Sequence, residues 1–464
     1  MEQKRSSFTG SIGFVLAAAG SAVGLGNIWR FPYLAAKDGG GVFLLCYLLL
    51  ALTFGFALLT TEIAIGRKTG QSPLTAYGML HKKFNWIGVF ACIVPVLILP
   101  YYSVIGGWIL KYVSVFLTGG AADAAQDSYF TGLITAQWEP IIWFVIYLLL
   151  TTFVVYKGVD KGIERLSTVL MPILLVLIIG IAVFSLTLSH TDDAGVTRTG
   201  LQGLGRYVIP NFKGMSIKTF VTILMDAMGQ LFYSISVAMG IMITYGSYVK
   251  KETNLSKSVN QIELFDTIVA FLAGLMIIPA VFTFQGEAGL ANSGPGLMFK
   301  ALPKIFSEMG GLGTAIGIVF FVMVAFAALT SSVSIMEAVV SCFMDKFKLE
   351  RKKATIVVCL IALILGLAVC LGYNVIYFDL TLPNGTVGQV LDVMDYLSNY
   401  ILMPIVAIAT CILIGWVVKP KTVLDEVTLG GVKFGRQKLY VVMVKYVTPV
   451  MLFFLLLQSL GLFL

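Results

Sequence analysis

Charged side chains are scarce in this chain of 464 residues. Asp, Glu, Lys and Arg make up 12% of it, whereas they make up about 25% of a typical soluble domain. A soluble or disordered protein of this length needs far more charge, so both classes are excluded. Hydrophobic residues instead reach 58% and the mean hydropathy is +0.92. The composition therefore predicts a membrane protein that crosses the bilayer several times.

Residues that bind metals or form disulfides are also few. The chain has two His, His81 and His190, and six Cys without a CxxC pair, so neither a histidine metal site nor a disulfide scaffold is expected. There is no HExxH motif and no GxxxxGK loop, which excludes a zinc peptidase and an ATP-driven pump of the P-loop kind. Without a paired nucleophile and base, no enzymatic activity is expected.

Long hydrophobic runs dominate what is present. Eleven of them are long enough to cross a bilayer as helices, which predicts an all-α polytopic membrane protein with eleven transmembrane helices. The runs lie near 11–36, 41–66, 88–117, 140–156, 167–188, 219–248, 259–284, 311–343, 354–373, 388–418 and 440–463.

The net charge of +8 is concentrated in alternate loops. With the N-terminus placed in the cytoplasm, the inside segments hold 22 of the 32 Lys and Arg residues, and the outside loop 118–139 holds none. This is the positive-inside pattern, so the charge indicates topology and no nucleic-acid partner. It predicts a multi-pass protein of the cell inner membrane or plasma membrane, with a cytoplasmic N-terminus and an outside C-terminus.

The first span contains a segment that forms a poor helix. Residues 20–27 read GSAVGLGN, with three Gly and one Asn in eight positions. Backbone carbonyls freed at this depth need a partner, and a cation in a protein-lined cavity is one such partner. A close helix-packing face from Gly20 to Gly24 is the alternative interpretation.

The sixth span has a similar segment, SISVAMG at 234–240, preceded by Gln230 and Tyr233. Spans 1 and 6 occupy equivalent positions if spans 1–5 and 6–10 are two halves, and halves of five spans are inverted relative to each other. Breaks at matching positions indicate a transporter site near the membrane midplane. We therefore expect a first half at 1–188, a second half at 189–418, and an inner loop with span 11 at 419–464.

Polar residues inside the spans suggest what is bound. Asp266 lies in an apolar helix with no basic residue within a turn, so a bound cation or a hydrogen-bonded structural role would explain it. Glu62 is expected to accept from backbone N–H groups freed by the broken helices. Thr330, Ser331 and Ser332 offer hydroxyls for an ion or for hydrogen bonds between helices. Hard oxygen ligands with one formal negative charge favour Na⁺ over Ca²⁺.

These residues also form a familiar pattern. The sequence GSAVGLGNIWRFP at 20–32, followed by GGG at 39–41, closely resembles the first-helix signature of the neurotransmitter:sodium symporter family. ITYGSY at 243–248, LTSS at 329–332 and KGIER at 161–165 are similar to further family motifs. The resemblance covers essentially the whole chain and is strongest to bacterial sodium-dependent amino-acid transporters. It implies a five-plus-five inverted repeat with broken helices 1 and 6.

The resemblance also implies two sodium sites and two gates. The first sodium site would use Ala22, Asn27, Ser234 and Asp266, and the second would use Gly20, Val23, Ala327, Thr330 and Ser331. Arg30 and Asp395 resemble the outer gate pair, and Arg5, Tyr248 and Asp345 resemble the inner gate. Chloride-dependent members have a neutral residue at the position of Asp266, so no chloride requirement is expected here.

The expected cargo is an α-amino acid. Monoamine transporters of the family have Asp at the position of Gly24, and Gly24 leaves room for a substrate that brings its own carboxylate. The resemblance places the pocket at Ser21, Ala22, Gly24, Leu25, Gly26, Ile98, Tyr102, Tyr233, Ser234, Ser236, Met239, Ser331 and Ile335. This mostly apolar lining predicts a large hydrophobic or aromatic substrate, carried by a monomer or weak dimer in contact with membrane lipid. A proton-coupled carrier in which Asp266 titrates is the alternative.

Overall fold

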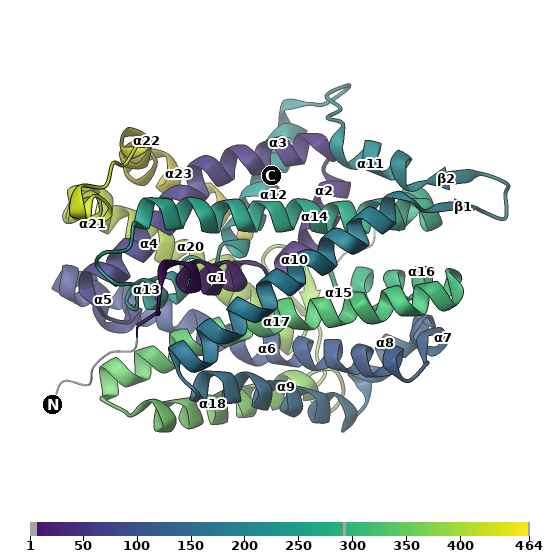
Figure 1. Ribbon diagram of the computed structural model, residues 1–464, viewed down its shortest axis with the longest axis horizontal. Coiled ribbons are helices and arrows are strands. Elements are labelled where there is room, and N and C mark those ends of the chain that lie inside the picture. The colour runs from purple at the N-terminus through teal and green to yellow at the C-terminus, as the bar shows by residue number, and fades with distance from the viewer. Residues whose placement is uncertain (1–6, 291–293, 463–464) are drawn as a thin grey trace.

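The computed structural model describes residues 7–290 and 294–462 (Figure 1). In this part of the chain, nine helical segments are long and apolar enough to cross a membrane, as the all-α prediction requires. They are Gly41–Thr69 (α3, Gly41–Leu50, and α4, Phe56–Thr69), Lys82–Leu117 (with α6, Asn85–Leu117), Glu139–Tyr156 (α9), Val159–Leu186 (with α10, Arg165–Leu186), Leu255–Gly289 (α14), Gly310–Phe347 (α17), Arg351–Leu371 (α18), Val390–Val417 (with α19, Val390–Asp395, and α20, Met403–Ile412) and Gln437–Ser459 (with α22, Gln437–Val442, and α23, Thr448–Ser459).

The two remaining predicted spans are the broken ones. The first consists of α1 (Ser11–Ala22) and a second piece, Gly26–Lys37, which ends in α2 (Phe31–Lys37) and is bent by 52° from α1. The sixth consists of α12 (Ile217–Ser234) and α13 (Ile241–Gly246), separated by six non-helical residues. Lys218, Asp226 and Gln230 make α12 more polar than the other spans, so it does not qualify as a spanning helix alone.

Short elements gather at the two ends of the bundle. Figure 1 shows α5 (Pro73–Leu80), α21 (Lys421–Val427) and α22 at one end; α5 and α21 belong to loops predicted to lie inside, and α22 begins the last span. The opposite end carries α7 (Ala121–Ala124), α8 (Asp127–Thr135), α16 (Leu302–Glu308) and the β1–β2 hairpin (Ser189–Thr191 and Thr197–Thr199), which belong to predicted outside loops. Loops predicted to lie on opposite sides of the membrane therefore lie at opposite ends of the bundle. Further short elements are α11 (Gly200–Val208), α15 (Gly294–Gly296) and the β3–β4 hairpin (Leu380–Thr381 and Val387–Gly388).

The broken first helix lies in the centre of the bundle. Helix α1 packs against α10, α14 and α17, as Figure 1 also shows. Its Ala17, Ala18 and Ala19 have no exposed surface. Small side chains allow neighbouring helices to approach closely on every side. The polar atoms released where α1 ends are therefore enclosed by protein.

Candidate binding site

The two breaks have unusual backbone geometry. After α1 the chain becomes extended at Val23 (φ −76°, ψ 95°) before it turns helical again at Gly26. After α12, Ser236 (φ 54°) and Ala238 (φ 62°) adopt left-handed conformations that residues other than Gly rarely take. Strain of this kind persists only where the surrounding structure imposes it, which is typical of functional sites.

The breaks face each other and share hydrogen bonds. Ser236 Oγ donates to the carbonyl of Ser21 at 3.1 Å, and Ser21 Oγ donates to Ser236 Oγ at 3.1 Å. Gln230 Nε2 donates to the carbonyl of Gly26 at 2.9 Å. Polar groups freed in one helix therefore find partners on the other, so the breaks form one structural unit.

Glu62 braces this unit from α4. Its Oε1 accepts the N–H of Ala238 at 2.6 Å, and the side chain is 2% exposed. The expected role of Glu62 is confirmed for this one N–H, which belongs to a strained residue.

We predict that Glu62→Ala abolishes uptake and lowers the stability of the folded protein by about 1–3 kcal/mol, the cost of an unsatisfied buried donor. Glu62→Gln keeps an acceptor oxygen and should retain most of the stability. Thermal unfolding in detergent, read beside uptake, measures both effects. Equal stability of the Ala variant and the wild type would show that the contact does not matter.

Asp266 lies at the centre of the first predicted sodium site. The carboxylate is 1% exposed and accepts hydrogen bonds from Asn27 Nδ2 at 2.8 Å and from Ser234 Oγ at 2.7 Å. Tyr47 OH also donates to it, at 3.1 Å. The structure thus brings together the three side chains predicted for this site. Sequence reasoning missed Tyr47, although it is the one hydroxyl in the otherwise apolar run of α3.

The second predicted sodium site is a group of oxygens between α1 and α17. Ser331 Oγ lies 3.4 Å from the carbonyl oxygen of Gly20 and 3.3 Å from that of Val23. The carbonyl oxygen of Ser21, which was not predicted, is 3.1 Å away. Thr330 Oγ1 lies 3.0 Å from the carbonyl oxygen of Ala327 on the same helix. Carbonyl and hydroxyl oxygens without sulfur or imidazole suit a hard monovalent cation.

One cavity adjoins these oxygens. All residues predicted for the substrate pocket line it, together with Asn27: Ser21, Ala22, Gly24, Leu25, Gly26, Ile98, Tyr102, Tyr233, Ser234, Ser236, Met239, Ser331 and Ile335.

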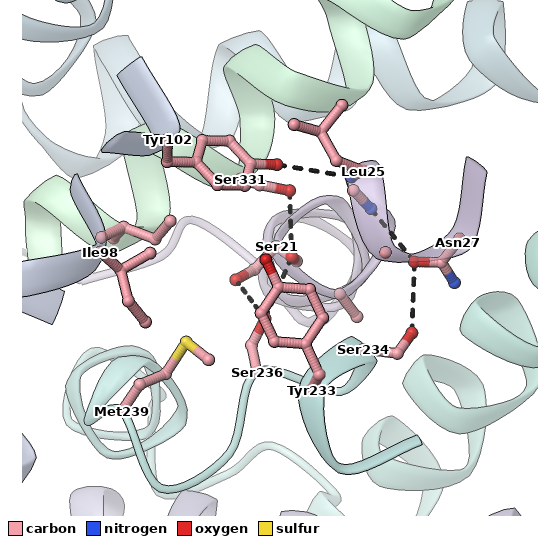
Figure 2. A pocket seen from close by; sticks show the side chains of 14 residues that line it. Ser21, Leu25, Asn27, Ile98, Tyr102, Tyr233, Ser234, Ser236, Met239 and Ser331 are labelled. Carbon is pink, nitrogen blue, oxygen red and sulfur yellow. Dashed lines mark hydrogen bonds between the residues drawn. The ribbon is translucent and has the colours of Figure 1, made fainter. Parts of the chain in front are cut away.

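The cavity has a polar side and an apolar side. Figure 2 shows Asn27 and Ser234 on one side and Ile98 and Met239 on the other. Tyr102 lies between them, and its OH accepts the N–H of Leu25 at 3.4 Å. This long contact leaves the hydroxyl able to bond a ligand. The arrangement can bind a molecule that has a charged or polar end and a hydrophobic end.

Gly24 lies close to two side-chain hydroxyls that line the cavity. A Cβ at this position would lie 2.6 Å from Ser331 Oγ and 3.0 Å from Tyr102 OH. A side chain at position 24 would therefore push against both of these cavity-lining groups. The space that the sequence assigned to a substrate carboxylate is open because residue 24 is Gly.

The outer gate residues lie near each other without direct pairing. The Arg30 guanidinium lies 5.8 Å from the ring centre of Tyr233 and 5.9 Å from that of Tyr400. Asp395 instead accepts hydrogen bonds from Tyr101 and Asn399. Within residues 7–290 and 294–462, no ion pair joins Arg30 to Asp395. Arg30 thus lies against aromatic faces, and Tyr101 and Asn399, the donors to Asp395, were not predicted.

The inner gate residues are partly outside the described residues, since Arg5 falls there. Tyr248 OH donates to Glu337 Oε1 at 2.6 Å, and Asp345 Oδ2 accepts the N–H of Ser72 at 2.6 Å. Glu337, for which the sequence suggested no role, pairs with Arg351 through two hydrogen bonds of 2.7 and 2.8 Å. Glu337 therefore links Tyr248 to the start of α18.

Sequence comparison identifies the class of protein. The model of the sodium:neurotransmitter symporter family matches residues 5–131 and 131–463, which is nearly the whole chain. The chain belongs to this family. It is therefore a sodium-dependent membrane transporter, as the sequence predicted, and not an enzyme.

Individual relatives agree with this class. The chain is 34% identical over 470 residues to an uncharacterized sodium-dependent transporter, YhdH, of Bacillus subtilis, with 99% of both chains covered. It is 31% identical over 453 residues to an uncharacterized sodium-dependent transporter of Methanocaldococcus jannaschii, covering 93% of this chain and 86% of the relative. The crystal structure of MhsT in complex with L-phenylalanine superposes with a TM-score of 0.85 at 33% identity, covering 98% of this chain and all of that one.

Proposed function

We propose that this protein imports a large hydrophobic or aromatic α-amino acid together with two Na⁺ ions, by alternating access and without chloride. The observation that carries the proposal is the two-sided cavity. Its polar side adjoins Asn27, Ser234 and Asp266, and its opposite side is apolar. A substrate in this cavity would place a charged end beside the ion ligands.

The polar end of the cavity suits a carboxylate. Gly24 leaves space beside Tyr102 OH, and the N–H of Leu25 lies within reach. A carboxylate there could accept these donors and also ligate the ion at Asn27 and Asp266. The ion and the substrate would then complete each other's site, which gives a physical reason for coupled transport.

The apolar end suits a large side chain. Ile98, Met239 and Ile335 line it and carry no charge, so an acidic or basic side chain would be buried unpaired. The superposable MhsT structure holds L-phenylalanine, which supports an aromatic substrate for this chain. The flexible thioether of Met239 can adjust to an aromatic face.

Met239→Phe should narrow this end of the cavity. We expect aromatic amino acids to lose affinity by about tenfold relative to leucine, because an overfilled pocket disfavours the larger substrate. Competition between labelled phenylalanine and unlabelled tyrosine, tryptophan, leucine and alanine measures the change. An unchanged order of inhibitor strength would mean that Met239 contributes to packing and does not select the substrate.

The same competition on the unmodified protein in sodium-driven proteoliposomes tests the proposed substrate class. Aromatic and large aliphatic amino acids should compete strongly, and alanine weakly. A strong preference for alanine would contradict a large hydrophobic substrate while leaving sodium coupling intact.

Two ions would supply enough energy for concentrative uptake. Each charge moving inward releases roughly 2.3 kcal/mol per 100 mV, so two release about 4.6 kcal/mol. That corresponds to about three powers of ten in the substrate ratio. ATP is then unnecessary.

Chloride independence has a structural basis in the partners of Asp266. Tyr47 OH and Ser234 Oγ are donors that could bind an anion, and both donate to the Asp266 carboxylate. The fixed carboxylate would thus provide the negative charge that a chloride ion could otherwise supply.

We further propose that residues 1–188 and 189–418 are the two inverted halves of the fold, followed by an inner loop and span 11 at 419–464, and that the protein acts as a monomer or weak dimer in the plasma membrane. The cytoplasmic N-terminus and outside C-terminus remain part of this proposal. In support, Gly461 lies against the carbonyl of Pro383, which belongs to a loop predicted to be outside.

A further inference from the structure

Two acidic residues meet a single lysine where the outer halves of the broken spans lie side by side. Lys37 ends α2 and Asp38 follows it, whereas Asp226 lies on α12. Helices α2 and α12 are in contact. Neither carboxylate belongs to the proposed sodium or substrate sites. The sequence analysis assigned no role to this cluster.

The geometry leaves one carboxylate oxygen without a donor. Lys37 Nζ lies 2.9 Å from Asp226 Oδ2 and 3.8 Å from Asp38 Oδ1. The Asp38 side chain is 5% exposed, and its buried Oδ2 accepts no hydrogen bond from the part of the chain that the structure describes. Lys37 therefore holds both carboxylates close to one ammonium. A buried carboxylate that shares one ammonium with a second, partly exposed carboxylate is unfavourable unless something else satisfies it.

We propose that Asp38 and Asp226 form a proton-binding site, in which one proton taken from the outer solution lies between the two carboxylates and fastens α2 to α12. The Asp38 carboxyl then donates its O–H to the Asp226 carboxylate, and Lys37 neutralises the remaining charge. One bound proton relieves the repulsion between the two carboxylates and gives the unsatisfied carboxyl oxygen a hydrogen bond. A divalent metal ion would need several more oxygen ligands than these two residues offer.

The surroundings of Asp38 favour the proton. Burial, followed by the negative charge of Asp226, raises the pKa of the Asp38 carboxyl, and Lys37 opposes this effect. Arg30 and Tyr33 on the same segment add weaker interactions with Asp226 and Lys37. On α11, Arg206 is already paired with exposed Glu287 at 2.7 Å, and α3 carries no charged side chain.

The direction in which external pH should change sodium affinity follows from the two helices that the proton would join, α2 and α12. Asn27 precedes α2 in the outer half of span 1, and Ser234 ends α12, so both halves carry ligands of the first proposed sodium site. Holding them together preorganises these ligands. Lower external pH should therefore lower the half-saturating sodium concentration, and higher external pH should raise it.

Infrared difference spectroscopy on the purified, full-length protein tests the site without relying on transport. Between about pH 5 and about pH 9, a carboxylic C=O band should titrate in the wild type. The band should be missing in both Asp38→Asn and Asp226→Asn. Lys37→Gln should move its midpoint upward by about one pH unit, because the ammonium stabilises the ionised pair. Glu308→Gln, an exposed control, should leave the band unchanged.

Sodium-dependent uptake provides the second measurement, with internal pH held constant. Asp226→Asn mimics the protonated pair, since its amide donates to Asp38 at every pH, so its half-saturating sodium concentration should be low and independent of external pH. If no band separates the wild type from the Asn variants, the proton site is wrong whatever is transported. If the band is present and sodium affinity still ignores external pH, the link to sodium binding is wrong.

Discussion

Asp266→Asn is expected to abolish chloride-independent uptake. The carboxylate is the fixed negative charge of the first proposed sodium site, and Asn27, Ser234 and Tyr47 all donate to it. A neutral amide leaves the bound cation without its counter-charge in a buried setting, where charge pairing matters most. We expect sodium affinity to fall by at least about tenfold, or about 1.4 kcal/mol.

Chloride should partly restore the activity of this variant. Tyr47 OH and Ser234 Oγ lose the charged oxygen that they contact in the wild type, and both can donate to an anion. Uptake measured with chloride, and with gluconate in its place, separates the two conditions. Exposed Glu308→Gln removes a carboxylate elsewhere and controls for the loss of charge. Intact uptake in Asp266→Asn that still ignores chloride would refute this role.

Gly24→Ala is expected to lower uptake by at least about a hundredfold while the protein stays folded. The added Cβ would lie 2.6 Å from Ser331 Oγ and 3.0 Å from Tyr102 OH. It would displace one hydroxyl from the proposed sodium ligands and another from the proposed carboxylate site. A loss of about 2.8 kcal/mol in binding corresponds to this factor, and it lies within the cost of overpacking a well-packed interior.

The matched control is Gly180→Ala, because nothing lies within 4 Å of a Cβ at that position of α10. Both variants add one methyl group, which at Gly24 enters the cavity and at Gly180 lies on an exposed face of α10. Binding of labelled phenylalanine to purified protein, checked by gel filtration for folding, compares them. Normal binding by Gly24→Ala would show that the cavity tolerates a larger residue and that its assignment is wrong.

The sequence predicts the first break better than the second. In span 1 the poor helix formers Gly20, Gly24, Gly26 and Asn27 reveal the break directly. In span 6 Ser236 and Ala238 are left-handed together with Gly240, and only the glycine is recognisable as such from sequence. Contacts with Glu62 and Ser21 impose their conformation. Tertiary contacts thus impose a backbone conformation that these residue types rarely adopt.

The residues that line the pocket were predicted through family resemblance. The partners of Arg30, Asp395 and Glu337 were not predicted. Every predicted lining residue reaches one cavity, because the family motif specifies both breaks and the helices around them. The partners of Arg30, Asp395 and Glu337 depend instead on side-chain orientations that spacing does not encode. Arg351 lies 14 residues after Glu337, across the turn from α17 to α18, and only the packing of these helices brings the two together.

The central claim is that sodium drives transport through this site. Labelled phenylalanine uptake into proteoliposomes should be measured with external Na⁺, and then with K⁺ in its place, at a constant pH gradient. The account predicts that uptake requires Na⁺ and collapses in K⁺. Undiminished uptake in K⁺ that follows the proton gradient would contradict it, and would favour a carrier in which Asp266 binds a proton in place of an ion.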